Sequence, residues 1–255
     1  MKKRVLVSLL EKNEGLARVL CQELARAGLD AQAHFWDASP ENMAWSLAAR
    51  ELASCSAWVI AGADFENRNV RRTLSLAALC AHAESGNGFP ILISPSGEAP
   101  EPSSLPDPLR GADVVKAGLG VKAAVQAGTF KKLMPEYRLR PHAPAGLGLW
   151  FEVGPAAAPW KGAFLAGGSA DTDKAVPDVH GVGRAGAIPS KCTLRYPVEG
   201  VRLEVRQVSC VGWGVKNELT PADSYYVRLG AIPDVLAFGP FPEADDAELY
   251  TVSLI

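Results

Sequence analysis

Three arginines spaced three and four residues apart are the clearest chemical signal in this sequence. Arg68, Arg71 and Arg72 fall in the first turns of a predicted helix, and this spacing places them on one face. Cations at a helix N-terminus oppose the helix dipole. A guanidinium group, however, presents a planar fork of N–H donors that suits a carboxylate or a phosphate. The cluster therefore predicts an anion-binding site, with a solvated charged turn paired to Glu66 as the alternative.

The elements that would position these arginines alternate between apolar runs and helical patterns. The predicted strands lie at 4–10, 31–36, 57–63, 89–94 and 113–116, and the helices at 14–28, 40–54, 67–85 and 117–134. Strands that alternate with helices pair in parallel through right-handed crossovers. We therefore expect residues 1–137 to form an α/β domain, a five-stranded doubly wound parallel sheet of order 2-1-3-4-5, as in flavodoxin-like domains.

Ligands of an open parallel sheet bind outside the carboxyl ends of the strands, where the strand order reverses. The ligand-binding residues predicted there are Ser8, Asp64, Arg68, Arg71, Arg72, Ser94 and Ser96. The loop after the first strand has one glycine and two acids, whereas a phosphate cradle needs converging backbone N–H groups. No cofactor and no catalytic residue are therefore expected. If the domain is an enzyme, Glu11 or Asp64 is the alternative general base.

The crossover before the fifth strand is rich in proline. Residues 98–108 include Pro100, Pro102, Pro106 and Pro108. Proline cannot donate to a helical hydrogen-bond ladder, so this crossover is expected to be mostly an extended loop.

From residue 138 the hydrophobic period becomes two, which is typical of strands with one buried face. Predicted strands lie at 147–153, 193–196, 201–208, 209–216, 225–229, 235–238 and 249–254. The 193–196 strand is expected to pair with 201–208 across Pro197–Gly200. Residues 138–255 are therefore predicted to form an all-β sandwich or barrel.

A glycine-rich stretch in this second half contains possible metal ligands. Gly181, Gly183 and Gly186 match G-x-G-x-x-G, but no strand–turn–helix context accompanies them, so a flexible loop is predicted. The acids and the histidine of the same stretch are Asp171, Asp173, Asp178 and His180. Oxygen and imidazole groups at such spacing can hold a divalent cation. Solvated loop residues are the favoured interpretation, so no metal is expected.

The order of the first-half strands resembles that of receiver and TIR domains. It is carried by Arg4–Val7, Ala57–Ile60, Phe89–Ile93 and Gly111–Lys116. The receiver resemblance implies an acidic pair after the first strand and a phospho-accepting Asp after the third. Leu9, Leu10 and Glu11 stand at the first position, and Ala61 or Gly62 at the second; Lys116 alone matches the receiver lysine. TIR enzymes carry a catalytic Glu on the helix after the third strand, and residues 67–83 contain no acid.

Composition narrows the choice of function. Lys and Arg number 26 against 28 Asp and Glu, which disfavours a nucleic-acid partner. No apolar window reaches the ~18 residues of a membrane helix. The five cysteines are an odd number and include no C-x-x-C pair, which favours a location in the reducing cytoplasm. We therefore expect a non-catalytic module that binds a small anionic ligand or a protein partner. The alternatives are a hydrolase-type enzyme for a nucleotide-like or acidic small molecule, and a structural protein that oligomerises through 249–255.

Overall fold

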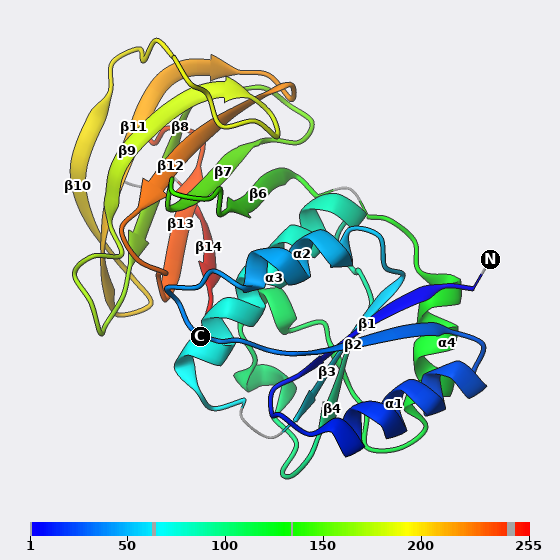
Figure 1. Ribbon diagram of the computed structural model, residues 1–255. Helices are drawn as coiled ribbons and strands as arrows, with labels where there is room; N and C mark the ends of the chain where they lie inside the picture. Colours follow the sequence, from blue (N-terminus) through cyan, green and yellow to red (C-terminus); the bar gives the residue numbers. More distant parts are fainter. Residues whose placement is uncertain (1, 63–64, 134, 244–247) are drawn as a thin grey trace. The chain divides into compact units, whose positions relative to one another are not determined.

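The computed structural model describes residues 2–62, 65–133, 135–243 and 248–255 (Figure 1). The chain divides into two compact units, Met1–Leu133 and Met134–Ile255. The sequence places the boundary a few residues later, between 137 and 138. Within the described ranges, no helix has both the length and the apolar character needed to cross a bilayer.

The first unit contains a five-stranded parallel sheet with the order β2-β1-β3-β4-β5, which confirms the predicted flavodoxin-like α/β fold. Its strands are β1 Arg4–Leu9, β2 Asp30–Phe35, β3 Ala57–Gly62, β4 Ile91–Pro95 and β5 Asp113–Val114. Its helices are α1 Glu14–Arg26, α2 Trp45–Leu52, α3 Arg68–Ser85 and α4 Leu119–Thr129, with short 3₁₀ turns η1 Pro102–Ser104 and η2 Asp107–Leu109.

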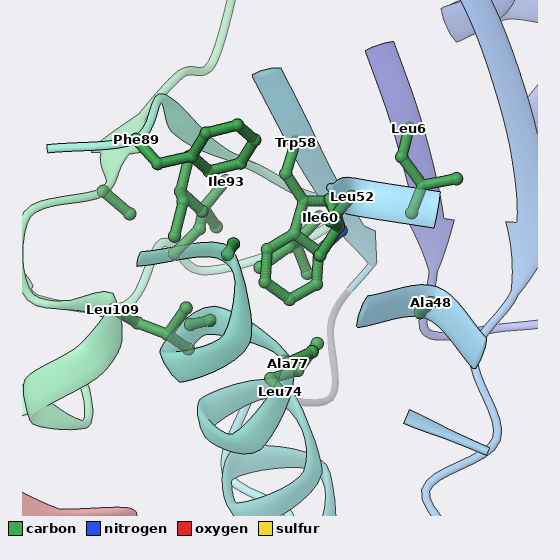
Figure 2. Packing of buried hydrophobic residues seen from close by; sticks show 14 of the residues in the cluster. Leu6, Ala48, Leu52, Trp58, Ile60, Leu74, Ala77, Phe89, Ile93 and Leu109 are labelled. Atoms are coloured by element: carbon green, nitrogen blue, oxygen red, sulfur yellow. The ribbon is translucent and has the colours of Figure 1, made fainter. Parts of the chain in front are cut away.

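Both faces of this sheet are covered, which explains why its strands read as continuous apolar runs. Successive side chains of a strand point to opposite faces, so Leu6 and Val7 of β1 enter two different cores. Figure 2 shows the first core, where Trp58 and Ile60 of β3 face the helix that carries Leu74. The other core lies against α1 and α4.

Two connections of this unit are compared with the prediction: the segment before α2 and the proline-rich crossover before β5. Helix α2 begins at Trp45 rather than at 40, because Asp37 Oδ1 accepts the Ser39 amide at 2.9 Å and holds the chain in a turn. The proline-rich crossover is a loop, as expected, apart from η1 and η2. Leu105 and Leu109 of this loop are buried in the core, so the loop is anchored by apolar contacts.

The second unit is a β-sandwich-like pair of antiparallel sheets, as the sequence predicts. One sheet has the order β10-β11-β8-β13-β14 and the other β6-β7-β12-β9. The strands are β6 Tyr137–His142, β7 Leu149–Pro155, β8 Trp160–Gly168, β9 Pro177–Arg184, β10 Val198–Val205, β11 Val208–Leu219, β12 Asp223–Leu229, β13 Val235–Gly239 and β14 Tyr250–Ser253. The C-terminal strand β14 pairs with β13 and forms one edge of its sheet.

The predicted hairpin across Pro197–Gly200 is wrong. Residues 193–196 form no strand, and β10 instead pairs with β11 across Arg206 and Gln207. Both turn residues have positive φ angles, 50° and 66°. This geometry matches the right-handed twist of the flanking strands, but neither residue type signals it.

The predicted flexible loop at the G-x-G-x-x-G match is also wrong, because Gly181 and Gly183 lie within β9. A Cβ added to Gly183 would lie 2.9 Å from Pro189 Cβ, and one added to Gly181 would lie 3.1 Å from Pro189 Cγ. The glycines therefore allow the segment after β9 to fold back directly onto the sheet.

Candidate functional site

The strand order of the parallel sheet reverses between β1 and β3, and Leu10 packs at this point. Gly62 ends β3 with a φ of 138°, and a Cβ there would lie 2.9 Å from Leu10 Cβ. The Leu10 amide donates to the Ala61 carbonyl at 2.8 Å. An apolar side chain therefore stands at the position where the wound fold places its ligand crevice.

Arg71 has its guanidinium group fixed by three acceptors from the surrounding loops. Nε donates to the Phe65 carbonyl at 2.6 Å, and Nη1 donates to the Ser104 carbonyl at 2.9 Å. Nη2 pairs with Glu66 Oε1 at 3.1 Å. The Arg71 side chain is 16% exposed, whereas that of Glu66 is 84% exposed. The contact with the Phe65 carbonyl is thus partly buried, whereas the contacts with the Ser104 carbonyl and the Glu66 carboxylate are open to solvent.

The other residues predicted at the carboxyl ends of the strands differ from one another in burial. Arg72 is buried, Arg68 is half-buried, and both belong to α3. Ser94 is half-buried near the end of β4, and the exposed Ser96 donates its amide to the Gly62 carbonyl at 3.0 Å. Asp64 lies outside the described residues. The fold thus brings the ends of β3 and β4 together near the start of α3.

The first turn of α3 is capped by the chain itself. Asn67 Oδ1 accepts the amides of Asn69 at 3.0 Å and Val70 at 3.3 Å. These are the N–H groups that an anion at a helix N-terminus would otherwise bind. An anion at this rim would therefore rely on arginine side chains.

Ser8 lies inside the sheet rather than at the rim. It belongs to β1 and is fully buried. The Trp58 indole Nε1 donates to Ser8 Oγ at 2.9 Å, and Ser8 Oγ lies 2.7 Å from His34 Nε2. Burial lowers the pKa of His34, against a smaller raising effect of Glu51. The alternative catalytic residue Glu11 is exposed in the loop after β1.

The four possible metal ligands do not converge. Asp178 forms a two-point pair with Arg228, with Nε–Oδ1 at 2.8 Å and Nη2–Oδ2 at 3.2 Å. His180 contacts Tyr225 and Glu199, while Asp171 and Asp173 lie between β8 and β9. In the described part of the chain, no group of three or more His, Cys, Asp or Glu residues can hold a metal ion.

A second polar cluster, in the β-sandwich unit, centres on the fully buried side chain of Glu152. Oε1 of this β7 residue accepts from Ser224 Oγ at 2.7 Å, the Gly186 amide at 2.8 Å and Arg138 Nε at 3.2 Å. Oε2 accepts from His142 Nε2 at 2.8 Å. These donors come from two strands, β6 and β12, and from the loop after β9.

The donors keep Glu152 ionised. Burial raises the pKa of the Glu152 carboxyl group, but hydrogen bonds from His142, Ser224 and the Gly186 amide outweigh it and hold the pKa at about 2. Nearby Tyr226 has its pKa raised to about 12, by burial and then by the charge of Glu152. Strongly shifted titratable groups of this kind concentrate at functional sites.

The sequence analysis missed this cluster. The available signal was an acid at position 152 inside the apolar stretch Leu149–Pro155, preceded by Arg138 and His142 at strand spacing. A charge in a strand buried on both sides requires partners.

Comparisons with known proteins add nothing to the description of these two polar clusters. No protein-family model and no curated protein matches this chain.

Proposed function

We propose that the α/β unit is a non-catalytic recognition module that binds an acidic group through Arg71. That group belongs to a small anionic ligand or to a protein partner. The proposal rests on one observation: two backbone carbonyls fix the guanidinium group of Arg71, while its third contact is the highly exposed Glu66 carboxylate.

Glu66 occupies the place that a ligand carboxylate would take. Exposed ion pairs contribute only about 0–1 kcal/mol, so an incoming anion displaces Glu66 at small cost. The Phe65 and Ser104 carbonyls keep the guanidinium group in place throughout. Because the arginine is already oriented, binding requires little loss of side-chain entropy.

The residues at the strand ends support binding without catalysis. The receiver resemblance requires acids after β1, where Leu9 and Leu10 stand, and an Asp at the end of β3, where Ala61 and Gly62 stand. Leu10 also packs against Gly62. We therefore propose that the α/β unit is a receiver-like scaffold that recognises a charged group without accepting a phosphoryl group.

The proposal is tested by titrating the full chain with succinate and with inorganic phosphate in a calorimeter. Glu66→Gln removes the internal competitor, so it is expected to bind the anion more tightly than the parent protein. Arg71→Lys loses the planar fork and is expected to bind at least about tenfold more weakly, a loss of about 1.4 kcal/mol.

Arg18→Lys is the control for the chemical change, because Arg18 is an exposed arginine of α1, on an element remote in sequence from the Arg71 contacts. It should leave the affinity unchanged. If Glu66→Gln and Arg71→Lys both bind like the parent protein, Arg71 is a structural brace and the proposed function fails.

A further inference from the structure

Strand β10 forms one edge of its sheet in the β-sandwich unit, and most of it is open to solvent. It stands first in the order β10-β11-β8-β13-β14 (Figure 1). Residues 199–202 and Glu204 are exposed, Leu203 is half-buried, and Val201 is 38% exposed. An edge strand presents a row of backbone N–H and C=O groups that can pair with another chain. The edge of β10 is therefore an interaction surface to be explained.

The turn between β10 and β11 determines which backbone groups of β10 point outward. Val205 and Val208 flank this two-residue turn and pair with each other, and such a turn closes on a hydrogen-bonded pair. Hydrogen-bonded and non-hydrogen-bonded pairs alternate along an antiparallel ladder. Leu203 therefore points its N–H and C=O toward β11, whereas Arg202 and Glu204 point theirs toward the free edge.

The two residues with outward backbone groups carry opposite charges. Arg202 and Glu204 are both exposed, and they lie on the same face of β10 because side chains alternate along a strand. Within the described part of the chain, neither side chain forms an ion pair or a side-chain hydrogen bond. The edge thus offers one free cation and one free anion, two residues apart.

This pattern is complementary to itself. A second copy of β10 can pair antiparallel with the first about a two-fold axis at Leu203. Arg202 then lies opposite Glu204 of the second copy, and Glu204 lies opposite Arg202 of the second copy. On the other face Val201 lies opposite Val205. Opposite-charge pairs and apolar pairs across neighbouring strands both stabilise a sheet, and a two-fold interface makes each contact twice.

Neighbouring registers are less favourable. Hydrogen bonding requires outward-pointing residues to lie opposite one another. An axis at Arg202 places two Arg202 side chains opposite each other, and an axis at Glu204 does the same with two Glu204 side chains. Like charges directly opposite destabilise a strand pair. An axis at Val201 pairs Arg202 with Gly200, where the register of β10 is irregular and φ is 76°.

The other edge strands of this unit lack such a pattern. Strand β6 carries Arg138 and Arg140 but no acid. In β9, Asp178 is already paired with Arg228. Strand β14 has no charged residue, so nothing along it specifies a register. Free opposite charges at alternate positions therefore distinguish β10 from these three strands.

We propose that the chain forms a two-fold symmetric homodimer in which β10 pairs antiparallel with β10 of a second copy. The occupant is a second copy because the charges of the edge complement themselves in one register only. The pairing joins the two sheets that contain β10 into one continuous sheet. Since the paired segment spans only residues 201–205, the dimer is reversible and its population depends on concentration.

The first test follows the oligomeric state of the full chain by sedimentation velocity over a concentration series that reaches the millimolar range. The parent protein is expected to pass from monomer to dimer. Arg202→Glu and Glu204→Arg each place like charges opposite each other and should weaken the dimer at least about tenfold. Arg18→Glu makes the same charge change as Arg202→Glu at an exposed arginine of α1 and should dimerise like the parent. A parent protein that stays monomeric throughout overturns the proposal.

The second test mixes the two charge variants. Arg202→Glu has two acids at the edge and Glu204→Arg has two arginines, so an equimolar mixture should form a heterodimer although neither variant dimerises well alone. The double variant Arg202→Glu/Glu204→Arg exchanges the charges and should recover the homodimer. Native mass spectrometry distinguishes these species by mass. If the parent dimerises but the mixture stays monomeric, the dimer uses another surface, such as 249–255, and the proposal is overturned.

The third test needs no variant. In the dilute parent protein, the amides of Arg202 and Glu204 should exchange rapidly with deuterium, whereas the Leu203 amide is protected by β11. Raising the concentration should slow the exchange of Arg202 and Glu204 and leave that of Leu203 unchanged. Nuclear magnetic resonance resolves the three amides. Protection of Arg202 and Glu204 in the monomer, or no change in their exchange on dimerisation, overturns the pairing through β10.

Discussion

The indole N–H of Trp58 donates to Ser8 Oγ at 2.9 Å inside the parallel sheet, from β3 to β1. Both side chains are fully buried. The same hydroxyl group lies 2.7 Å from His34 Nε2 on β2, so one short polar chain joins three neighbouring strands. This arrangement satisfies the one polar atom of a large aromatic side chain that otherwise fills the core.

Replacing Ser8 should therefore destabilise the fold. Ser8→Ala leaves Trp58 Nε1 buried without its acceptor, and an unsatisfied buried donor costs about 1–3 kcal/mol. Urea unfolding followed by tryptophan fluorescence measures the loss. Ser96→Ala, at an exposed serine, is the control and should change stability by less than about 0.5 kcal/mol. Equal effects of the two variants would contradict the assigned role of Ser8.

Arg71 should also hold the proline-rich crossover in place. Arg71→Ala removes the hydrogen bond to the Ser104 carbonyl, and hydrogen bonds to charged groups contribute about 1.5–3 kcal/mol. Cleavage after Glu98 by a glutamate-specific protease should then accelerate, because Glu98 lies in this loop and is followed by alanine.

Arg110→Ala is the control within the same loop. Its partner Asp107 is three residues away, at 2.8 Å, and the Arg110 side chain is 55% exposed. Such a pair contributes little, so cleavage should be nearly unchanged. A loop that resists the protease in Arg71→Ala would show that the buried Leu105 and Leu109 suffice to anchor it.

The depressed pKa of Glu152 predicts a loss of stability in acid. The folded protein holds this pKa at about 2 against an ordinary value of 4.5, so the unfolded chain binds the proton first. The stabilisation is complete above pH 4.5 and disappears as the pH falls toward 2. It amounts to at most about 3 kcal/mol.

Urea unfolding between pH 2 and pH 6 measures this dependence. Glu152→Gln cannot titrate, so its stability should fall less steeply across the same interval than that of the parent protein. Parallel curves for the two proteins would mean that other carboxyl groups account for the acid sensitivity.

Local periodicity was enough to predict the strands and helices of the α/β unit, because each buried run such as 57–63 is followed by its own helix, and the strand order followed from the flavodoxin-like class of such sheets. Local periodicity could not predict the contacts of Arg71, because the Ser104 carbonyl comes from a loop 33 positions away in the sequence. The Glu152 cluster was harder still. Its donors Arg138 and Ser224 are 86 positions apart, and period-two patterns show which face a residue occupies but not its neighbour on the next strand.

The β10–β11 hairpin also could not be predicted from local sequence, although its two strands are neighbours in the chain. Proline and glycine at 197–200 are good turn formers, yet the chain turns at Arg206 and Gln207, whose φ angles are 50° and 66°. Residues other than Gly, Asn and Asp seldom adopt this conformation. Pairing of Val201, Leu203 and Val205 with β11 therefore determines the position of the turn, against the preference of the turn residues.

This strained turn leads to a stabilising substitution. A left-handed conformation costs an L-residue about 1–2 kcal/mol, whereas the greater freedom of glycine in the unfolded chain costs about 0.5–1 kcal/mol. Gln207→Gly should therefore raise the free energy of unfolding by roughly 0.5–1 kcal/mol. Gln22→Gly, at an exposed position of helix α1, makes the same chemical change without positive φ and should lower it by up to about 1 kcal/mol. Urea unfolding of both variants measures the difference, and two shifts of the same sign would contradict strain at Gln207.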